Sequence, residues 1–225
     1  MQPRLKPILQ VLSLILTFLF CPITNAEPIN LALAKNDAKN YHDSGLYQEE
    51  LAAKIKKAQE YIIQQAIENQ HSKRPKKLAV VLDIDETSIS NYDKMVQRDF
   101  APDLERIHQE IMAADAPAIK STLALYQKAI QHGVKVFFVT GRREFERDAT
   151  RKNLLQAGYK GWTGLYLRPQ DYSQHSIMPF KSNARAKIIK RGYTIVASIG
   201  DQYSDILGGN TLKGFKLPNP YYYLP

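Results

Sequence analysis

Apolar residues follow two different spacings along this chain, and each spacing predicts a different kind of element. Between Gly45 and Asn69 they recur every three or four positions, which is typical of an amphipathic helix, with Ser44 as its expected N-cap. Residues 78–82 then form an unbroken apolar run, typical of a buried parallel strand. Residues 27–43, in front of the helix, are polar and are expected to be loosely structured.

The rest of the chain repeats this change between helix and strand. Further helices are predicted over residues 121–131, 145–156 and 181–190, and further strands over residues 134–139, 164–167 and 194–199. Residues 94–118 predict short helices and loops. Because strands alternate with helices, the chain is expected to be an α/β protein with a parallel sheet and right-handed crossovers.

Polar residues follow three of the four predicted strands. Asp83 and Asp85 come after the first strand, Thr140 and Gly141 after the second, and Asp201 after the last. Ligands of open α/β sheets bind beyond the carboxyl ends of the strands. We therefore expect these side chains to meet at one edge of the sheet, although they are far apart in the sequence.

The residue types in this group match the needs of phosphoryl transfer. Asp83 and Asp85 are two positions apart, so their carboxylates repel unless a metal or a shared proton intervenes. One can act as nucleophile while the other carries a proton. Asp201 adds an oxygen ligand, and an all-oxygen site suits Mg²⁺. Thr140 and the amides after Asp83 can donate to phosphate oxygens, and Lys181, at the expected start of a helix, brings a cation.

Each of these signals is weak when it stands alone. An Asp-x-Asp pair is also found in turns and calcium loops, although a calcium-binding helix–loop–helix needs a glycine where Ser88 stands. Thr140 is otherwise a helix cap, Lys181 a solvated lysine and Gly200-Asp201 a turn. The hypothesis depends on their joint placement at successive strand ends.

The start of the chain predicts export. A short basic segment precedes a mostly apolar run over residues 8–20, and residues 24–26 resemble a signal peptidase site. We expect residues 1–26 to be a cleaved signal peptide and residues 27–225 to form one domain, periplasmic or secreted. A membrane anchor is the alternative, but the run is shorter than the roughly 20 residues that span a bilayer. Bulky residues before Cys21, the only cysteine, disfavour a lipid anchor there.

Composition limits the partners. The apolar fraction is 44% and the charged fraction 24%, as in an ordinary globular protein, and the formal net charge is +9. A basic balance favours anionic partners. The charges are dispersed and no arginine–aromatic repeat stands out, so we expect small phosphorylated substrates and no nucleic acid. A solvated basic surface is the alternative interpretation.

Four ordered motifs over residues 40–225 resemble one known family. They are residues 81–87 (VLDIDET), 138–142 (FVTGR), 180–182 (FKS) and 200–205 (GDQYSD), followed by residues 215–220 (FKLPNP). This pattern is similar to the acid phosphatases of the haloacid dehalogenase superfamily. The subgroup includes plant acid phosphatases, vegetative storage proteins and bacterial outer-membrane or periplasmic acid phosphatases. The resemblance implies a Rossmann-like parallel sheet with a small helical cap lobe.

The resemblance also implies roles for the site residues. Asp83 would attack phosphorus and bind Mg²⁺, and Asp201 would be a further ligand of the ion. Asp85 would protonate the leaving alcohol and then activate water, with its main-chain carbonyl on the metal. Asp205 would support the water shell of the metal. The phosphate would be held by Thr140, Gly141 and Lys181.

The remaining expectations concern the cap and the alternatives. Segments 45–69 and 94–118 are expected to form the helical lobe, with Tyr92 and the tyrosines at 221–223 flanking a substrate ring, unless they are packing aromatics. A protonated acid predicts faster turnover below neutral pH. Because Asp83 is present, we favour an active phosphatase over a silent storage protein of the same fold. Transfer of the phosphoryl group to an alcohol stays open, as does oligomer formation.

Overall fold

The structure, a computed structural model, describes residues 27–225. The expected signal peptide and Cys21 lie outside the described residues. The chain divides into two compact units between Ala34 and Lys35, inside helix α2 (Leu31–Asp43). The fold described in the following paragraphs is that of the second unit, Lys35–Pro225. The expected domain of residues 27–225 contains this whole unit, and its start stays a prediction. Among the described helices, none is long and apolar enough to cross a membrane.

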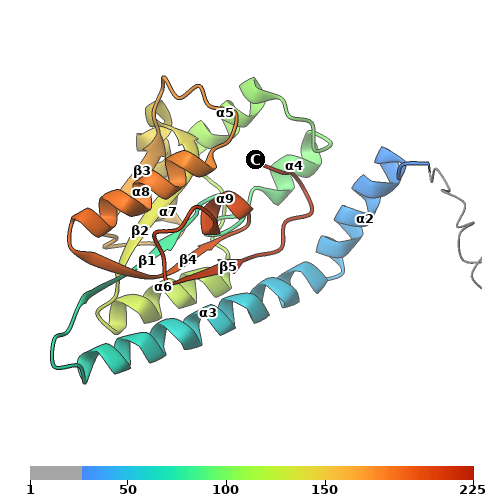
Figure 1. The fold of residues 1–225 in the computed structure, drawn as a ribbon. Coiled ribbons are helices and arrows are strands. Elements are labelled where there is room, and N and C mark those ends of the chain that lie inside the picture. The colour runs from blue at the N-terminus through green and yellow to red at the C-terminus, as the bar shows by residue number, and fades with distance from the viewer. Residues whose placement is uncertain (1–26) are drawn as a thin grey trace, which may run out of the picture. The chain divides into compact units, whose positions relative to one another are not determined.

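One five-stranded sheet forms the centre of the fold, in the order β3-β2-β1-β4-β5, and all of its pairs are parallel (Figure 1). The strands are β1 (Lys77–Leu82), β2 (Lys135–Arg143), β3 (Gly164–Arg168), β4 (Tyr193–Gly200) and β5 (Lys213–Lys216). The predicted α/β fold is confirmed, and the four predicted strands are β1 to β4. The fifth strand was not predicted, because a four-residue segment with a lysine at each end carries no apolar run.

Helices cover both faces of the sheet. They are α3 (Leu46–Gln70), α4 (Tyr92–Gln97), α5 (Leu104–Ala113), α6 (Lys120–Gln131), the 3₁₀ turn η1 (Glu144–Glu146), α7 (Arg147–Gln156), α8 (Met178–Lys190) and α9 (Tyr203–Ile206). Alternate residues of a strand point to opposite faces. Accordingly, Leu82 and Phe138 pack in one core with α3 and α6, and Val81 and Phe137 pack in a second core with α8.

Helix α3 runs along the sheet beside α6 (Figure 1). Its buried stripe is the one that the spacing predicted: Leu51, Ile55, Ala58, Ile62 and Ala66. Burying one such isoleucine side chain contributes roughly 1.5–3 kcal/mol, so this stripe is enough to hold the helix on the sheet. The placement of residues 45–69 in a lobe over the site is therefore wrong for the body of α3.

A helical cap stands at the carboxyl edge of the sheet and is built from the segment between β1 and α6. It contains α4 and α5, which agrees with the short helices predicted over 94–118. Arg98, which directly follows α4, donates to Glu110 of α5 at 2.7 Å, with both side chains largely buried. Asp103 caps α5 by accepting from the amide of Arg106 at 3.1 Å. Lys94 of α4 also donates to the carbonyl of Glu110 at 3.0 Å, so side chains from the α4 end of the cap hold α5 in place.

Three local expectations are wrong. Residues 31–43 form helix α2 instead of a loose segment, because Asn30 accepts from the amide of Ala32 at 2.9 Å and caps an alanine-rich sequence. The N-cap of α3 is Gly45 in the left-handed conformation (φ 88), and the Ser44 hydroxyl instead donates to Tyr41 O at 3.2 Å. Helix α8 begins at Met178, ahead of Lys181, because a proline in its first turn favours a helix start.

Candidate active site

Three buried carboxylates meet where β1 and β4 end. Asp83 follows β1, Asp201 follows β4, and Asp205 lies in α9 just beyond. One oxygen of each carboxylate lies within 4.8 Å of the other two, which is close enough for a shared cation. The neighbouring positions of β1 and β4 in the sheet bring these residues together. The donor set is all carboxylate oxygen, which fits a hard divalent cation.

Lys181 supplies the positive charge inside this group. Its ammonium donates to Asp83 Oδ1 at 2.9 Å and to Asp205 Oδ1, and the side chain is buried. Burial alone would lower the pKa of Lys181, but the charges of Asp205 and Asp83 raise it well above its ordinary value. Lys181 is therefore a fixed cation that leaves a net charge of −2 when all three carboxylates are ionised.

Backbone and side-chain atoms of neighbouring residues pack closely around Asp205. A Cβ on Gly200 would lie 2.1 Å from Asp205 Oδ2, so only glycine allows Asp205 to approach the end of β4. The same Oδ2 accepts from the amide of Gln202 at 2.8 Å. Ser198 donates to the carbonyl of Asp205 at 2.7 Å, and Arg185 donates to it at 2.8 Å. These contacts fix the Asp205 carboxylate against Lys181.

Asp201 is oriented by three side-chain donors. Thr87 donates to Oδ1 at 2.9 Å, while Gln202 and Asn219 donate to Oδ2 at 2.7 Å each. Burial, and then the charge of Asp205, raises the pKa of Asp201 despite these donors. Two donors therefore occupy Oδ2 and one occupies Oδ1, which leaves Oδ1 the freer oxygen for a cation.

Asp83 begins a tight turn at the end of β1. Its amide donates to Ile199 O at 3.0 Å, and its carbonyl accepts from Ser88 Oγ at 2.6 Å. Glu86 in the same turn adopts the left-handed backbone region (φ 53), which is uncommon for a residue with a side chain. Burial and the charge of Asp205 raise the pKa of Asp83 well above its usual range, against the opposing effect of Lys181.

Asp85 is not one of these three carboxylates and pairs with Arg142. The guanidinium contacts both oxygens, with Nη2 2.7 Å from Oδ1 and Nε 3.0 Å from Oδ2, and Asn91 donates to Oδ1 at 2.9 Å. Burial opposes ionisation, but Arg142 and Asn91 lower the pKa of Asp85. In the free protein Asp85 is thus an ionised partner of Arg142, which differs from the protonated acid expected from the sequence.

Thr140 and Gly141 lie inside β2, which extends past them to Arg143. Thr140 is buried and pairs with Leu167 of β3, and its hydroxyl accepts from the amide of Arg142 at 3.1 Å. Gly141 is half-buried, and a Cβ there would meet only Ile177 at 4.0 Å. Their role in phosphate binding stays a prediction.

Glu86 is a fourth buried carboxyl beside the site. Burial, followed by the charges of Asp85 and Asp201, raises its pKa from 4.5 to about 8. Its oxygens accept from the amide of Asn91 at 2.6 Å and from the Tyr222 hydroxyl at 2.9 Å. The C-terminal tail therefore contacts the turn that carries Asp83 and Asp85.

Tyr92 is packed into an aromatic cluster. It is 7% exposed, its ring stacks on His42 and lies 5.4 Å from the ring of Tyr221, and its hydroxyl donates to Asp43 at 2.7 Å. These contacts fit the packing alternative, and stacking against a substrate ring stays a prediction.

Several residues that shape the site had no role assigned from the sequence: Glu86, Thr87, Arg142, Gln202 and Asn219. All five stand inside the quoted motifs, so the motifs themselves were the available signal. The approach of Asn219 and Tyr222 depends on the path of the tail after β5, which no periodic pattern predicts.

Comparison with known proteins finds a matching family model and several similar proteins. The family model described as HAD superfamily, subfamily IIIB (Acid phosphatase), matches residues 22–225. Acid phosphatase 1 of Solanum lycopersicum is 38% identical over 149 residues, which cover 64% of this chain and 58% of that protein. The stem 28 kDa glycoprotein of Glycine max is 45% identical over 113 residues, covering 49% and 44%. The matched segments thus span about half the length of these relatives.

Solved structures show the same fold. The class C acid phosphatase from Bacillus anthracis superposes with a TM-score of 0.67, covering 85% of this chain and 86% of that chain. Sequence identity over the superposition is 21%, so the likeness is one of fold.

Proposed function

Because the chain belongs to the acid phosphatases of HAD superfamily subfamily IIIB, we propose that it is a Mg²⁺-dependent phosphomonoesterase that uses Asp83 as its nucleophile. The observation that carries the proposal is the group of Asp83, Asp201 and Asp205 around the buried Lys181 ammonium. Three segments of the chain converge to build it, at the sheet edge where α/β proteins bind ligands.

The cation would be held by Asp83 and Asp201, with Asp205 and the main-chain carbonyl of Asp85 beside it. When bound, Mg²⁺ would supply positive charge that keeps Asp83 ionised and screens the phosphate oxygens. Asp201 is prepared for this role because Thr87, Gln202 and Asn219 already fix its carboxylate. Lys181 and Thr140 would orient the phosphate, so that binding energy is used for alignment.

In the first step an oxygen of Asp83 attacks phosphorus. The new bond joins Asp83 to phosphorus, and the bond between phosphorus and the ester oxygen breaks with its electron pair on that oxygen. The leaving oxygen then needs a proton. In the second step water attacks phosphorus, the bond to Asp83 breaks, and inorganic phosphate leaves.

Asp85 is the residue that we propose gives the first proton and takes one from water in the second step. In the free protein the Arg142 pair keeps it ionised. An incoming phosphate is itself an anion and would compete with Asp85 for the Arg142 guanidinium. Loss of that pairing would leave the burial effect to raise the pKa of Asp85 and prepare it as an acid.

The physiological setting is part of the proposal. We propose an exported protein, periplasmic or secreted, that acts on small phosphorylated substrates. The net charge is +9, of which Arg4 and Lys6 of the expected signal peptide carry two, and the remaining +7 (9 − 2) favours anionic substrates by long-range attraction. The relatives include storage and stem glycoproteins, so a silent member of the fold is the alternative that an assay must exclude.

The test is hydrolysis of an aryl phosphate with and without Mg²⁺. We expect turnover that chelation abolishes and that Asp83→Asn reduces by at least ~1000-fold. The matched control is Asp93→Asn, an exposed carboxylate on α4, which should keep full activity. Mass spectrometry of an acid-quenched reaction should find a phosphoryl group on the peptide that contains Asp83.

Two results would contradict the proposal. Binding of phosphate esters without turnover in excess Mg²⁺ would identify a silent binding protein. Equal activity of Asp83→Asn and the wild type would remove Asp83 as nucleophile. Adding an alcohol acceptor to the same assay separates hydrolysis from phosphotransfer, because transfer yields a new ester in place of inorganic phosphate.

A further inference from the structure

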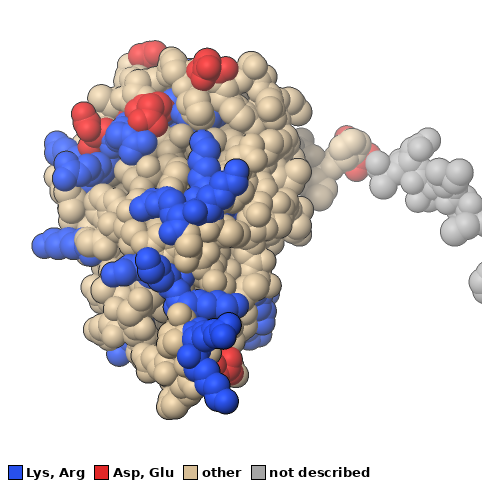
Figure 2. Space-filling view, turned by 60° about the vertical axis from the view of Figure 1, so that its left-hand side comes forward, with Lys and Arg blue, Asp and Glu red and all other residues tan. Residues whose placement is uncertain are grey.

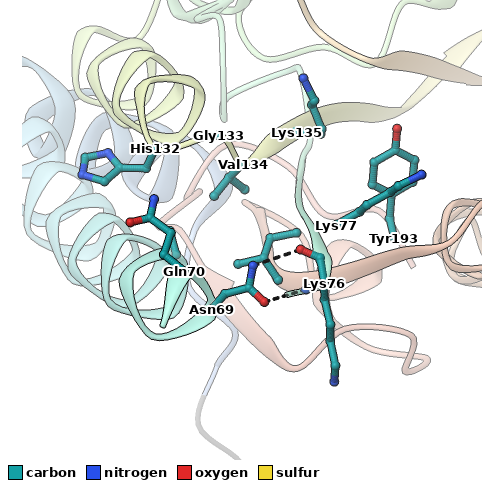
Figure 3. A pocket seen from close by; sticks show the side chains of 11 residues that line it. Asn69, Gln70, Lys76, Lys77, His132, Gly133, Val134, Lys135 and Tyr193 are labelled. Atoms are coloured by element: carbon teal, nitrogen blue, oxygen red, sulfur yellow. Dashed lines mark hydrogen bonds between the residues drawn. The ribbon is translucent and has the colours of Figure 1, made fainter. Parts of the chain in front are cut away.

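The amino edge of the sheet, opposite the catalytic edge, is built by three segments that we call the basic edge: residues 69–77, 128–135 and 187–193. Lys77 pairs with Tyr193 across β1 and β4, and Ala79 pairs with Lys135 across β1 and β2, so the segments are neighbours. A pocket of about 290 Å³ lies among them (Figure 3).

The basic edge concentrates charge of one sign. Its cations, all exposed, are Lys73, Arg74, Lys76, Lys77, Lys128, Lys135, Lys187, Lys190 and Arg191. The three segments contain no aspartate and no glutamate. Figure 2, which turns the left-hand side of Figure 1 forward, shows Lys and Arg running across this face with few acidic groups between them. Such a surface attracts extended anions.

The directions of the lysines argue against a site for one small anion. In Figure 3 the side chains of Lys76, Lys77 and Lys135 point different ways from the pocket. Asn69 is already engaged, because its amide group exchanges hydrogen bonds of 2.9 and 2.8 Å with the backbone of Lys76. A small anion would reach one of these cations at a time, whereas a broad anionic surface would face several.

Exposed apolar side chains stand among or beside these cations. Ile67, Ile130 and Ile189, in the last turns of α3, α6 and α8, are 46%, 38% and 41% exposed. Apolar side chains near cations are typical of surfaces that lie on anionic lipid. On such a surface the burial of apolar area and the attraction of the cations to the headgroups both contribute to binding. Single-stranded nucleic acid is instead bound by stacking on free aromatic faces, and Tyr193 is packed against Phe137 and lies under the Arg191 guanidinium.

We infer that the basic edge docks on an anionic lipid bilayer. The cations bind the headgroups, and the three isoleucines enter the interface between headgroups and acyl chains. The cluster of Asp83, Asp201 and Asp205 lies at the opposite, carboxyl edge of the sheet. Docking through the basic edge therefore leaves the candidate active site open to soluble substrates. The inference does not depend on the proposed phosphatase activity.

The test is sedimentation of the full chain with phosphatidylcholine vesicles, with and without phosphatidylglycerol, at low and high salt. The edge variant is Lys73→Glu/Arg74→Glu/Lys76→Glu, and the matched control is Lys54→Glu/Lys56→Glu/Lys57→Glu on the exposed side of α3. Each cation near an anionic bilayer is worth about fivefold in partitioning, so losing three should weaken binding roughly 100-fold, and the reversed charges of the edge variant should weaken it further. The control should lose far less, and a glutamine version of the edge variant guards against misfolding.

Other outcomes would overturn the inference. No binding to phosphatidylglycerol vesicles, or equal losses in the edge and control variants, would show that the basic edge has no specific role. Binding that survives high salt and the edge variant would assign the vesicle contact to another part of the chain. Tight binding of a DNA oligonucleotide without vesicle binding would identify a different class of partner.

Discussion

Replacing Glu86 by glutamine tests the electrostatics of the site through stability. In the unfolded chain this carboxyl ionises near 4.5, and in the folded protein burial and the charges of Asp85 and Asp201 raise its pKa to about 8. Between these two pH values, the Glu86 carboxyl must take up a proton when the chain folds. The metal-free protein should therefore lose stability as the pH rises from about 4.5 to about 8, and Glu86→Gln should not share that loss.

The size of the effect follows from the shift of the pKa. The difference of about 3.5 units corresponds to about 5 kcal/mol above pH 8, about 3 kcal/mol at pH 7 and about 1 kcal/mol at pH 5. The substitution also has a cost. A glutamine oxygen can still accept from Asn91, but its amide faces the Tyr222 hydroxyl, which must turn and accept. That cost is about 1 kcal/mol and does not vary with pH, so it leaves the slope unchanged.

Urea unfolding in EDTA at pH 5, 7 and 9 measures the difference between Glu86→Gln and the wild type. Glu60→Gln on the exposed side of α3 is the control and should change little at any pH. A difference for Glu86→Gln that is the same at all three pH values would refute the reasoning. It would show that the carboxyl ionises normally in the folded protein despite its burial.

Three further predictions concern the site and its support. Asn219→Ala removes a donor to Asp201 and should raise the Mg²⁺ concentration for half-maximal activity about tenfold, with maximal activity nearly kept; an unchanged titration would exclude this role. Lys181→Met leaves Asp83 and Asp205 buried without their cation and should lower the free energy of unfolding in EDTA by about 3–5 kcal/mol, measured in urea. Ile62→Ala should cost about 2–5 kcal/mol in the same assay without changing the Mg²⁺ titration; a loss below 1 kcal/mol would contradict the packing of α3 on the sheet.

The fold was predictable wherever one side of an element is clearly apolar. The stripe of α3 and the apolar run of β1 are strong periodic signals, and both elements lie where they were expected. Helix α2 and strand β5 were missed because neither has such a signal. The first has one buried residue, Ala38, and the second exposes or half-exposes all four of its residues. The position of α3 against the sheet required knowledge of its partner, which periodicity does not supply.

The site was predictable as a set of residues but only partly as a network. Parallel strands place Asp83 and Asp201 at one edge by topology, so strand order is enough to bring them together. The pairing of Asp85 with Arg142 depends on side-chain directions after the register of β2 shifts between Thr140 and Arg143. The contact of Asn219 with Asp201 depends on a tail without regular structure. Local spacing contains neither kind of information.

The charge of the site connects its stability to its proposed cofactor. Asp83, Asp201 and Asp205 with one Lys181 leave an excess of two negative charges in a buried space when all are ionised, and burial raises the pKa of Asp83 and Asp201 accordingly. A monovalent cation would cancel half of that excess, whereas a divalent cation cancels all of it. Repulsion among these carboxylates therefore destabilises the metal-free protein, and a bound divalent ion relieves the same repulsion. Removing one of them, as in Asp201→Asn, should stabilise the metal-free protein and at the same time weaken its stabilisation by Mg²⁺.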